Sequence, residues 1–275
     1  MTYSAEPIRS PDNARLKAVR ALRAGRDREH LLLEGRRLLA EALAAGHVPE
    51  WVLHDAEVMD DPVLDALLAA AAAAGAELLP CAPHLLRSVG DLDSPADVLA
   101  WAKRPEVDAN ALLEALQPGE WLLAAAGVQD PGNLGALARV AAGLGAAGML
   151  AAVGGASPWH PRALRGASGT SLRLPVAERA DLPALLGPAR ARGVQVWAAD
   201  SSGVDARVAA DTWQTAGRPP AILVFGEEGR GLPAEIARVC DVWVAVPLKR
   251  GVESLNVATA AAVLAWELFA RAERP

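Results

Sequence analysis

The chain has 275 residues, of which 52% are apolar, so it is long enough for one large domain or two smaller domains with a real core. Its formal net charge of -6 argues mildly against a nucleic-acid partner. The two cysteines, Cys81 and Cys240, and the five histidines have no spacing that suits a metal or a redox pair, so no metal site is predicted.

The N-terminal part of the chain predicts a compact α/β unit in which short helices and strands alternate. Leu16, Val19 and Leu22 recur at helical spacing from residue 14, and Gly25 can end that helix. The other expected elements are strands at 31–33, 51–54 and 77–79, helices at 36–45, 61–75 and 82–88, and an element of either type at 98–102.

Basic residues concentrate near the start of this unit, although the protein is acidic overall. They are Arg9, Arg15, Lys17, Arg20, Arg23, Arg26, Arg28, Arg36 and Arg37, and within that span only Asp12, Asp27, Glu29 and Glu34 oppose them. A local basic patch can hold a phosphate backbone, whereas the same pattern also fits a solvated helix face. Charge alone does not separate these two interpretations.

A linker is expected at 105–119, where polar residues and the turn signal Gln117-Pro-Gly-Glu120 separate a domain at 1–104 from one at 120–275. Beyond it, strands are expected at 122–126, 149–153, 194–199, 221–225 and 242–246, an extended segment at 174–176, and helices at 133–144, 161–167, 182–192, 233–239 and 256–272. This pattern predicts a mostly parallel sheet with helices on both faces. Ligands of such sheets lie beyond the carboxyl ends of the strands.

Three loops rich in Gly, Pro and Asn fall at that edge of the predicted sheet. They are 128–135, 224–232 and 246–257, and each joins a strand-like run to a helix. Gly residues let backbone N–H groups approach a ligand closely, because no side chain stands in the way. We therefore expect the three loops to build one composite pocket.

The first loop delivers Asn133 to the start of a helix, where it could act as the N-cap. Arg139 lies about 200° around the axis from Leu137, and therefore away from the apolar stripe of that helix. It is the only charged residue between Asp130 and Arg162. We interpret Arg139 as a ligand contact, with a solubility charge as the alternative.

The second loop packs three Gly residues around charged ones, more than a plain turn needs, and presents Glu228 to the ligand. The third begins the last helix with Ser254-Leu-Asn256, where Ser254 fits an N-cap. No His follows His160, so a hydrolase triad has little support. A dinucleotide fingerprint is also missing after the first strand of the second half.

These motifs resemble those of the SpoU-type RNA 2′-O-ribose methyltransferases of the SPOUT superfamily, in order and at suitable separations. The matching segments are 130–135 with Arg139, 226–231, and 247–257, together with 164–169 and Leu174-Pro175. Upstream, Ser10-Pro-Asp-Asn13, Lys17 and Leu33-Glu-Gly35 resemble the N-terminal substrate-binding domain of that family, an α/β fold similar to certain ribosomal proteins.

The resemblance implies a deep trefoil knot in the C-terminal domain, an exception to the rule against knotted chains. It implies S-adenosylmethionine as the cofactor, held near Gly226, Val246, Pro247, Leu248 and Leu255. It also implies a homodimer in which each active site draws on both subunits. The methyl group would go to a ribose 2′-hydroxyl of ribosomal or transfer RNA, with ribosomal RNA slightly favoured.

By the same resemblance, catalytic roles fall to residues of all three loops, namely Asn133, Arg139, Glu228, Ser254 and Asn256. Arg139 would activate the hydroxyl, and the others would order the ribose. The basic patch becomes an RNA contact through Arg15, Lys17, Arg20 and Arg36. The pair Lys249-Arg250 is either a further phosphate contact or an exposed loop charge.

Two rival functions remain to be weighed. A non-catalytic RNA-binding or ribosome-assembly protein on this fold predicts the loss of Asn133, Arg139 or Ser254, and all three are present. A Rossmann-type enzyme predicts a glycine-rich dinucleotide fingerprint after the first strand of the second half, and that fingerprint is absent. The start of the chain lacks the segments of a signal peptide, and no apolar run suits a membrane span, so a cytoplasmic protein is expected.

Overall fold

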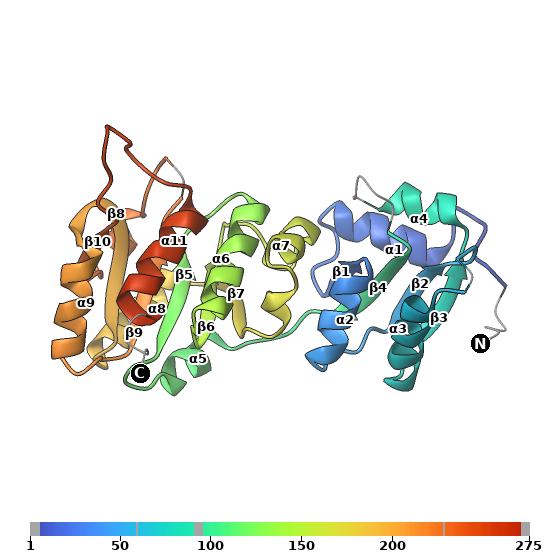
Figure 1. Ribbon diagram of the computed structural model, residues 1–275, viewed down its shortest axis with the longest axis horizontal. Coiled ribbons are helices and arrows are strands. Elements are labelled where there is room, and N and C mark those ends of the chain that lie inside the picture. Colours follow the sequence, from blue (N-terminus) through green and yellow to red (C-terminus); the bar gives the residue numbers. More distant parts are fainter. Residues whose placement is uncertain (1–5, 59, 91–95, 228, 271–275) are drawn as a thin grey trace. The chain divides into compact units, whose positions relative to one another are not determined.

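The computed structural model describes residues 6–58, 60–90, 96–227 and 229–270. The chain divides into two compact units (Figure 1). The first comprises Met1–Pro105 with Trp159–Leu172, and the second comprises Glu106–Pro158 with Arg173–Pro275. The chain therefore passes from one unit to the other three times.

The first unit is built on a four-stranded sheet of order β1-β4-β2-β3, in which β4 runs antiparallel to both neighbours and β2 is parallel to β3. Its elements are α1 (Ala14–Arg23), β1 (His30–Glu34), α2 (Arg36–Ala44), β2 (Trp51–Asp55), α3 (Pro62–Ala73), β3 (Glu77–Cys81), α4 (Pro83–Val89) and β4 (Val98–Lys103). Trp51 and Trp101 stack on neighbouring strands with ring centroids 5.2 Å apart. The segment 98–102, which the sequence left open, is therefore a strand.

A segment from the second half of the sequence completes this unit. It holds α7 (Pro161–Gly166) and the 3-10 turn η1 (Thr170–Leu172). Arg165 of α7 lies 3.4 Å from the buried carboxylate of Glu34, which also accepts a 2.9 Å hydrogen bond from Arg23. His47 Nε2 lies 2.8 Å from the carbonyl oxygen of Leu172. These contacts tie the late segment to β1 and α2.

The second unit has a six-stranded sheet of order β10-β8-β9-β5-β6-β7, and every pairing in it is parallel. Its elements are α5 (Ala109–Ala115), β5 (Trp121–Ala125), α6 (Pro131–Gly143), β6 (Gly148–Ala152), β7 (Val176–Ala180), α8 (Leu182–Ala191), β8 (Gln195–Asp205), α9 (Ala206–Thr215), β9 (Ala221–Phe225), α10 (Ala234–Ala237), β10 (Val242–Ala245), α11 (Val257–Ala265) and the π-helical turn η2 (Trp266–Ala270). The predicted mostly parallel sheet is confirmed.

Helices cover both faces of this sheet, as the sequence predicted. On one face α6 packs against α11, and α9 packs against η2 (Figure 1). Phe269 of η2 stacks on Trp121 there, with ring centroids 4.7 Å apart. On the other face α8 packs against α5 and α10, over a core that includes Leu122, Val196 and Val224. The loops of the candidate site follow the carboxyl ends of the strands, between these two layers of helices.

Strand β8 is longer than the predicted 194–199 and is interrupted. Trp243 pairs with Ala198, whereas the next residue of β10, Val244, pairs with Val204, so residues 199–203 of β8 bulge out of the ladder. A Cβ atom on Gly203 would lie 2.5 Å from the backbone nitrogen of Val244. Only glycine therefore lets the strand return to β10 after the bulge.

Some elements differ from the prediction. The helix α9 was not predicted, and residues 105–119, whose role as a linker stays a prediction, include the helix α5. The predicted closing helix at 256–272 is α11 followed by the π-helical turn, and its last two residues lie outside the described part of the chain.

Candidate active site

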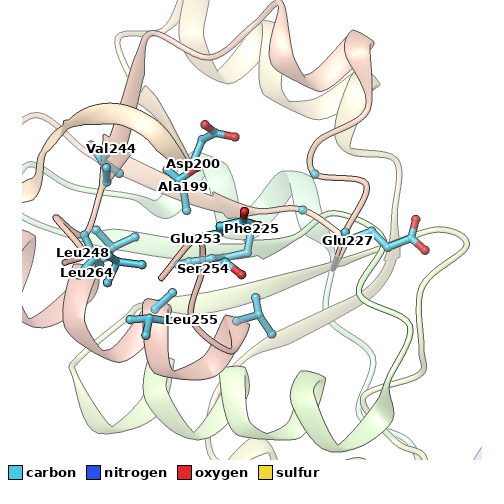
Figure 2. Close-up of a pocket in the computed structure, with 18 residues that line it drawn as sticks. Ala199, Asp200, Phe225, Glu227, Val244, Leu248, Glu253, Ser254, Leu255 and Leu264 are labelled. Carbon is cyan, nitrogen blue, oxygen red and sulfur yellow. The ribbon is translucent and has the colours of Figure 1, made fainter. Parts of the chain in front are cut away.

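A cavity of about 410 Å³ lies at the carboxyl edge of the parallel sheet, where β8, β9 and β10 end (Figure 2). This volume falls in the range of small-molecule sites. Its walls come from the bulge of β8, from the loop after β9, from the loop after β10 and from α11. Leu248, Leu255 and Leu264 lie on one side of the cavity in the view of Figure 2, and Glu227 lies on the other.

The loop after β9 is shaped by its glycines. A Cβ atom on Gly226 would lie 2.4 Å from the carbonyl oxygen of Gly231, so the two backbones touch here. Glu227 and Gly231 exchange two backbone hydrogen bonds, of 3.0 Å and 2.9 Å. Gly229 and Gly231 both have positive φ values, of 82° and 69°. Glu228, the expected catalytic residue of this loop, lies outside the described residues.

The loop after β10 supplies most of the apolar wall. Val246, Leu248, Ser254 and Leu255 line the cavity, as does Gly226 of the preceding loop. Pro247, expected beside them as a cofactor contact, is exposed and is not part of the lining. The structure thus brings most of the predicted cofactor residues to one cavity.

A hydrogen bond between two asparagine side chains joins the first and third loops. Asn256 caps α11 by accepting from the N–H of Ala258 at 3.0 Å, and its Nδ2 donates to Asn133 Oδ1 at 3.0 Å. Neither residue is part of the cavity lining. The caps differ from expectation: Asp130, not Asn133, caps α6, and Asn256, not Ser254, caps α11. Asn133 and Ser254 are therefore not the N-caps of these two helices.

Arg139 is exposed on α6, whereas Leu134, Leu137, Ala138 and Ala141 form the buried stripe of that helix. This agrees with the orientation expected from helical geometry. Arg139 lies outside the lining of the cavity. Arg139 therefore lies on the exposed side of the helix that carries Asn133.

The basic residues proposed to bind RNA are engaged within the first unit. Arg15 forms a 2.8 Å ion pair with Glu77, Lys17 lies 3.1 Å from Asp12, and Arg20 donates to the carbonyl of Pro11 at 2.7 Å. Side chains of Arg15 and Lys17 remain about half exposed, at 42% and 58%. Exposed ion pairs of this kind contribute little to stability.

Arg36 is held more firmly than the other three. Its guanidinium donates to Asp97 at 2.7 Å and lies 2.6 Å from Asp61, the N-cap of α3. The hydrogen bond from Arg36 lowers the pKa of the Asp61 carboxyl, and the hydrogen bonds to Asp97 and Asp61 raise the pKa of Arg36. Arg36 therefore has a structural role whether or not it also meets RNA.

Sequence reasoning missed part of the lining. Asp200 and Ser201 of the bulge, and Glu253 before the last helix, also line the cavity. The pattern Asp200-Ser-Ser-Gly203 is typical of an Asx turn and was the available signal. Among the described residues no group of three or more His, Cys, Asp or Glu is placed to hold a metal. Within the same ranges, no helix combines the length and apolar character that a membrane crossing requires.

Comparison with known proteins adds to this geometry. The model of the SpoU rRNA Methylase family matches residues 120–266, and that of the MRM3-like substrate binding domain matches residues 13–100. An uncharacterized tRNA/rRNA methyltransferase from Synechocystis sp. is 31% identical over 97% of this chain and 94% of its own. The 23S rRNA (guanosine(2553)-2'-O)-methyltransferase RlmP from Bacillus subtilis is 28% identical over 95% and 98% of the two chains. An AdoMet-bound rRNA methyltransferase from Sinorhizobium meliloti superposes with a TM-score of 0.84, at 26% identity over 98% and 99%.

Proposed function

The chain belongs to the SpoU rRNA Methylase family, and from this membership we propose that it transfers a methyl group from S-adenosylmethionine to a ribose 2′-hydroxyl in RNA. The observation that carries the proposal is that the bulge of β8, the loops after β9 and β10, and α11 wall a single cavity. The second candidate, a non-catalytic RNA-binding protein on this fold, has no observation of its own in its favour.

The cavity suits the proposed cofactor. Its volume of about 410 Å³ and its leucine side, formed by Leu248, Leu255 and Leu264, fit a flat base such as adenine. The glycine loop at 226–231 brings backbone groups close to the space beside it. When bound, S-adenosylmethionine would supply an electrophilic methyl carbon on a positively charged sulfur, and Gly226, Val246, Leu248 and Leu255 would hold it.

The residues of this chain then have the task of orienting the ribose and favouring loss of its proton. We assign the ordering of the ribose to Asn133, Ser254 and Asn256, with Glu228 as a further candidate. The 3.0 Å bond between Asn256 and Asn133 supports this, because it holds two of these side chains in one arrangement. A guanidinium is a poor proton acceptor, so we assign Arg139 the role of orienting the ribose and stabilising charge beside an RNA phosphate.

Ribosomal RNA is the substrate that we favour over transfer RNA. The N-terminal match to a substrate-binding domain and the similarity to an rRNA guanosine methyltransferase support this choice. We assign the RNA contact of the first unit to Arg15, Lys17 and Arg20, whose side-chain interactions are exposed. The expected cytoplasmic location stays a prediction.

The deep trefoil knot also belongs to the proposal. Strand β10 lies at the edge of the sheet, and the helix that follows it, α11, packs against α6, the helix that follows β5. The chain after β10 must therefore return past the ends of β8 and β9. Such a return is what a knotted path requires. The close contact of Gly226 with Gly231 fits a second loop drawn tight around that path.

A homodimer is the last part of the proposal. Val263 of α11 and Trp266 of η2 lie on successive helical turns and are 42% and 41% exposed. Large apolar side chains that are exposed side by side on one helical surface are typical of a subunit interface. Arg139, exposed on the neighbouring helix α6 and outside its own cavity lining, would then serve the active site of the partner subunit.

The direct test is calorimetry followed by methylation mapping. We expect the purified chain to bind S-adenosylmethionine and not NAD. RNA from a strain that lacks the protein should lose one 2′-O-methyl mark, which the intact gene restores. Binding of NAD instead, or an unchanged methylation map, would contradict the proposal.

Arg139→Ala gives a sharper test of the assigned mechanism. We expect transfer to fall by a factor of at least about 100, with cofactor affinity unchanged, because the charge acts on the ribose rather than on the cofactor. Arg238→Ala, which removes another exposed guanidinium of the second unit, is the matched control and should retain full turnover. Retained turnover in Arg139→Ala would remove this residue from the mechanism.

A further inference from the structure

The bulge of β8 places Asp200 in the wall of the cavity. It lies in the bulge at residues 199–203, which has no partner on β10, and Asp200 itself lines the cavity. Bulges beside active sites commonly redirect one side chain, at the expense of strand pairing. The glycine that closes the bulge, Gly203, touches the backbone of Trp243 and Val244.

The carboxylate of Asp200 is oriented by its own turn. The backbone N–H of Ser202 donates to Asp200 Oδ1 at 2.8 Å, and the Ser202 hydroxyl donates to the same oxygen at 2.6 Å. Both bonds end on Oδ1, so Oδ2 keeps its acceptor capacity. A carboxylate held in this way costs little further entropy when a ligand arrives.

The charges of the cavity all have one sign. Asp200, Glu227 and Glu253 line it, and among the described lining residues there is no Lys, Arg or His. Such a wall favours a cationic ligand and gives no equal advantage to a neutral one. The proposed cofactor carries a sulfonium and an ammonium against one carboxylate, whereas its product, S-adenosylhomocysteine, has lost the sulfonium charge.

We propose that Asp200 is a specificity-determining residue of the cofactor pocket, whose negative charge favours the cationic methyl donor over the neutral product. This inference rests on the proposed function. Methyl transfer would therefore remove the positive charge that Asp200 attracts. The neutral product would then be exchanged more readily for another molecule of the cationic donor. Asp200 is not assigned a part in the transfer step.

The experiment compares Asp200→Asn with the wild type by calorimetry, using S-adenosylmethionine, S-adenosylhomocysteine and sinefungin, which has an amine in place of the sulfonium methyl group. Asn can still accept both bonds from Ser202, so the turn is kept. We expect the two cationic ligands to bind about threefold to tenfold more weakly and the product to change by less than about twofold. The difference should shrink as ionic strength rises from about 0.1 M to about 1 M.

Asp211→Asn, on the exposed face of α9, removes the same charge outside the cavity lining and should leave all three affinities unchanged. Retained product binding shows that the Asp200→Asn pocket is folded. Equal losses for donor and product would overturn the inference, since they indicate a contact with a group common to both. Unchanged affinities would overturn it as well. If the wild type binds none of the three ligands, the proposed function fails instead.

Discussion

Gly226 is the single residue on which the shape of the cavity depends most directly. A methyl group there would lie 2.4 Å from backbone atoms of Gly231, and backbone cannot move aside as a side chain can. We expect Gly226→Ala to cost roughly 1–3 kcal/mol of stability and to weaken cofactor binding at least about tenfold. Denaturant unfolding and calorimetry measure the two effects.

Gly143→Ala is the matched control, because a Cβ atom at this end of α6 meets nothing within 4 Å. It should be neutral or stabilise the protein by up to about 1 kcal/mol. Equal behaviour of the two variants would show that the contact between Gly226 and Gly231 does not shape the pocket.

Arg36 gives a prediction for pH dependence. The pKa of Asp61 is lowered from its usual 3.8, chiefly by the hydrogen bond from Arg36. A lowered carboxyl pKa contributes stability that is present above 3.8 and is lost as pH falls through the folded-state value. Arg36→Ala should therefore be less stable than wild type at neutral pH, and the difference should narrow in acid.

Denaturant unfolding between neutral pH and acid measures this difference, with Arg37→Ala as the control. Arg37 is exposed on the same helix, so its removal should produce no such pH dependence. A gap between Arg36→Ala and wild type that stays constant through the titration would mean that the pair with Asp61 is not its source.

At the scale of elements, the side-chain link between Asn256 and Asn133 joins two helix starts. Asn256→Ala removes both the cap of α11 and the donor to Asn133, so we expect a loss of about 1 kcal/mol together with slower methyl transfer. Asn256→Asp keeps the capping oxygen and loses only the donor. It should therefore unfold like wild type and still transfer slowly; normal turnover in Asn256→Asp would show that the link is dispensable.

Much of the element order was predictable, and the misses have physical causes. In α9 the buried positions Ala206, Ala209, Ala210 and Trp213 have helical spacing, but alanines carry too weak an apolar signal to stand out. The bulge of β8 depends on its register with β10, a strand that lies far along the chain. Local pattern contains no information about such a pairing.

The candidate site likewise combines residues that were predictable from the sequence with one that was not. The glycine loops were predictable because glycine has a specific backbone use, and Gly226, Leu248 and Leu255 line the cavity. Asp200 was missed because its sequence position marks only a turn. What brings it to the cavity is the combination of that turn with the edge of the sheet.

At the scale of the whole molecule, Glu34 is the main buried charge of the first unit. Its side chain is 1% exposed and pairs with Arg23 and, 131 residues away in the sequence, with Arg165. Glu34→Gln removes the buried carboxylate that both guanidinium groups share, so we expect a loss of about 2–3 kcal/mol. Glu77→Gln breaks an exposed pair with Arg15 and should cost less than about 0.5 kcal/mol.

Thermal unfolding of the two variants makes the comparison. Similar melting temperatures for Glu34→Gln and Glu77→Gln would mean that the buried cluster adds no more than a surface pair does. Long-range partners of this kind were beyond sequence reasoning, because nothing near Glu34 in the sequence marks it as buried.

The late segment at 159–172 bears on how the protein is made. A ribosome releases the chain from its first residue onward, so the strands and helices up to Pro105 emerge long before Arg165 and Leu172 do. During that interval the nascent first unit lacks the pair between Glu34 and Arg165 and has no α7 beside β1. Its completion must wait until part of the second unit has already been translated.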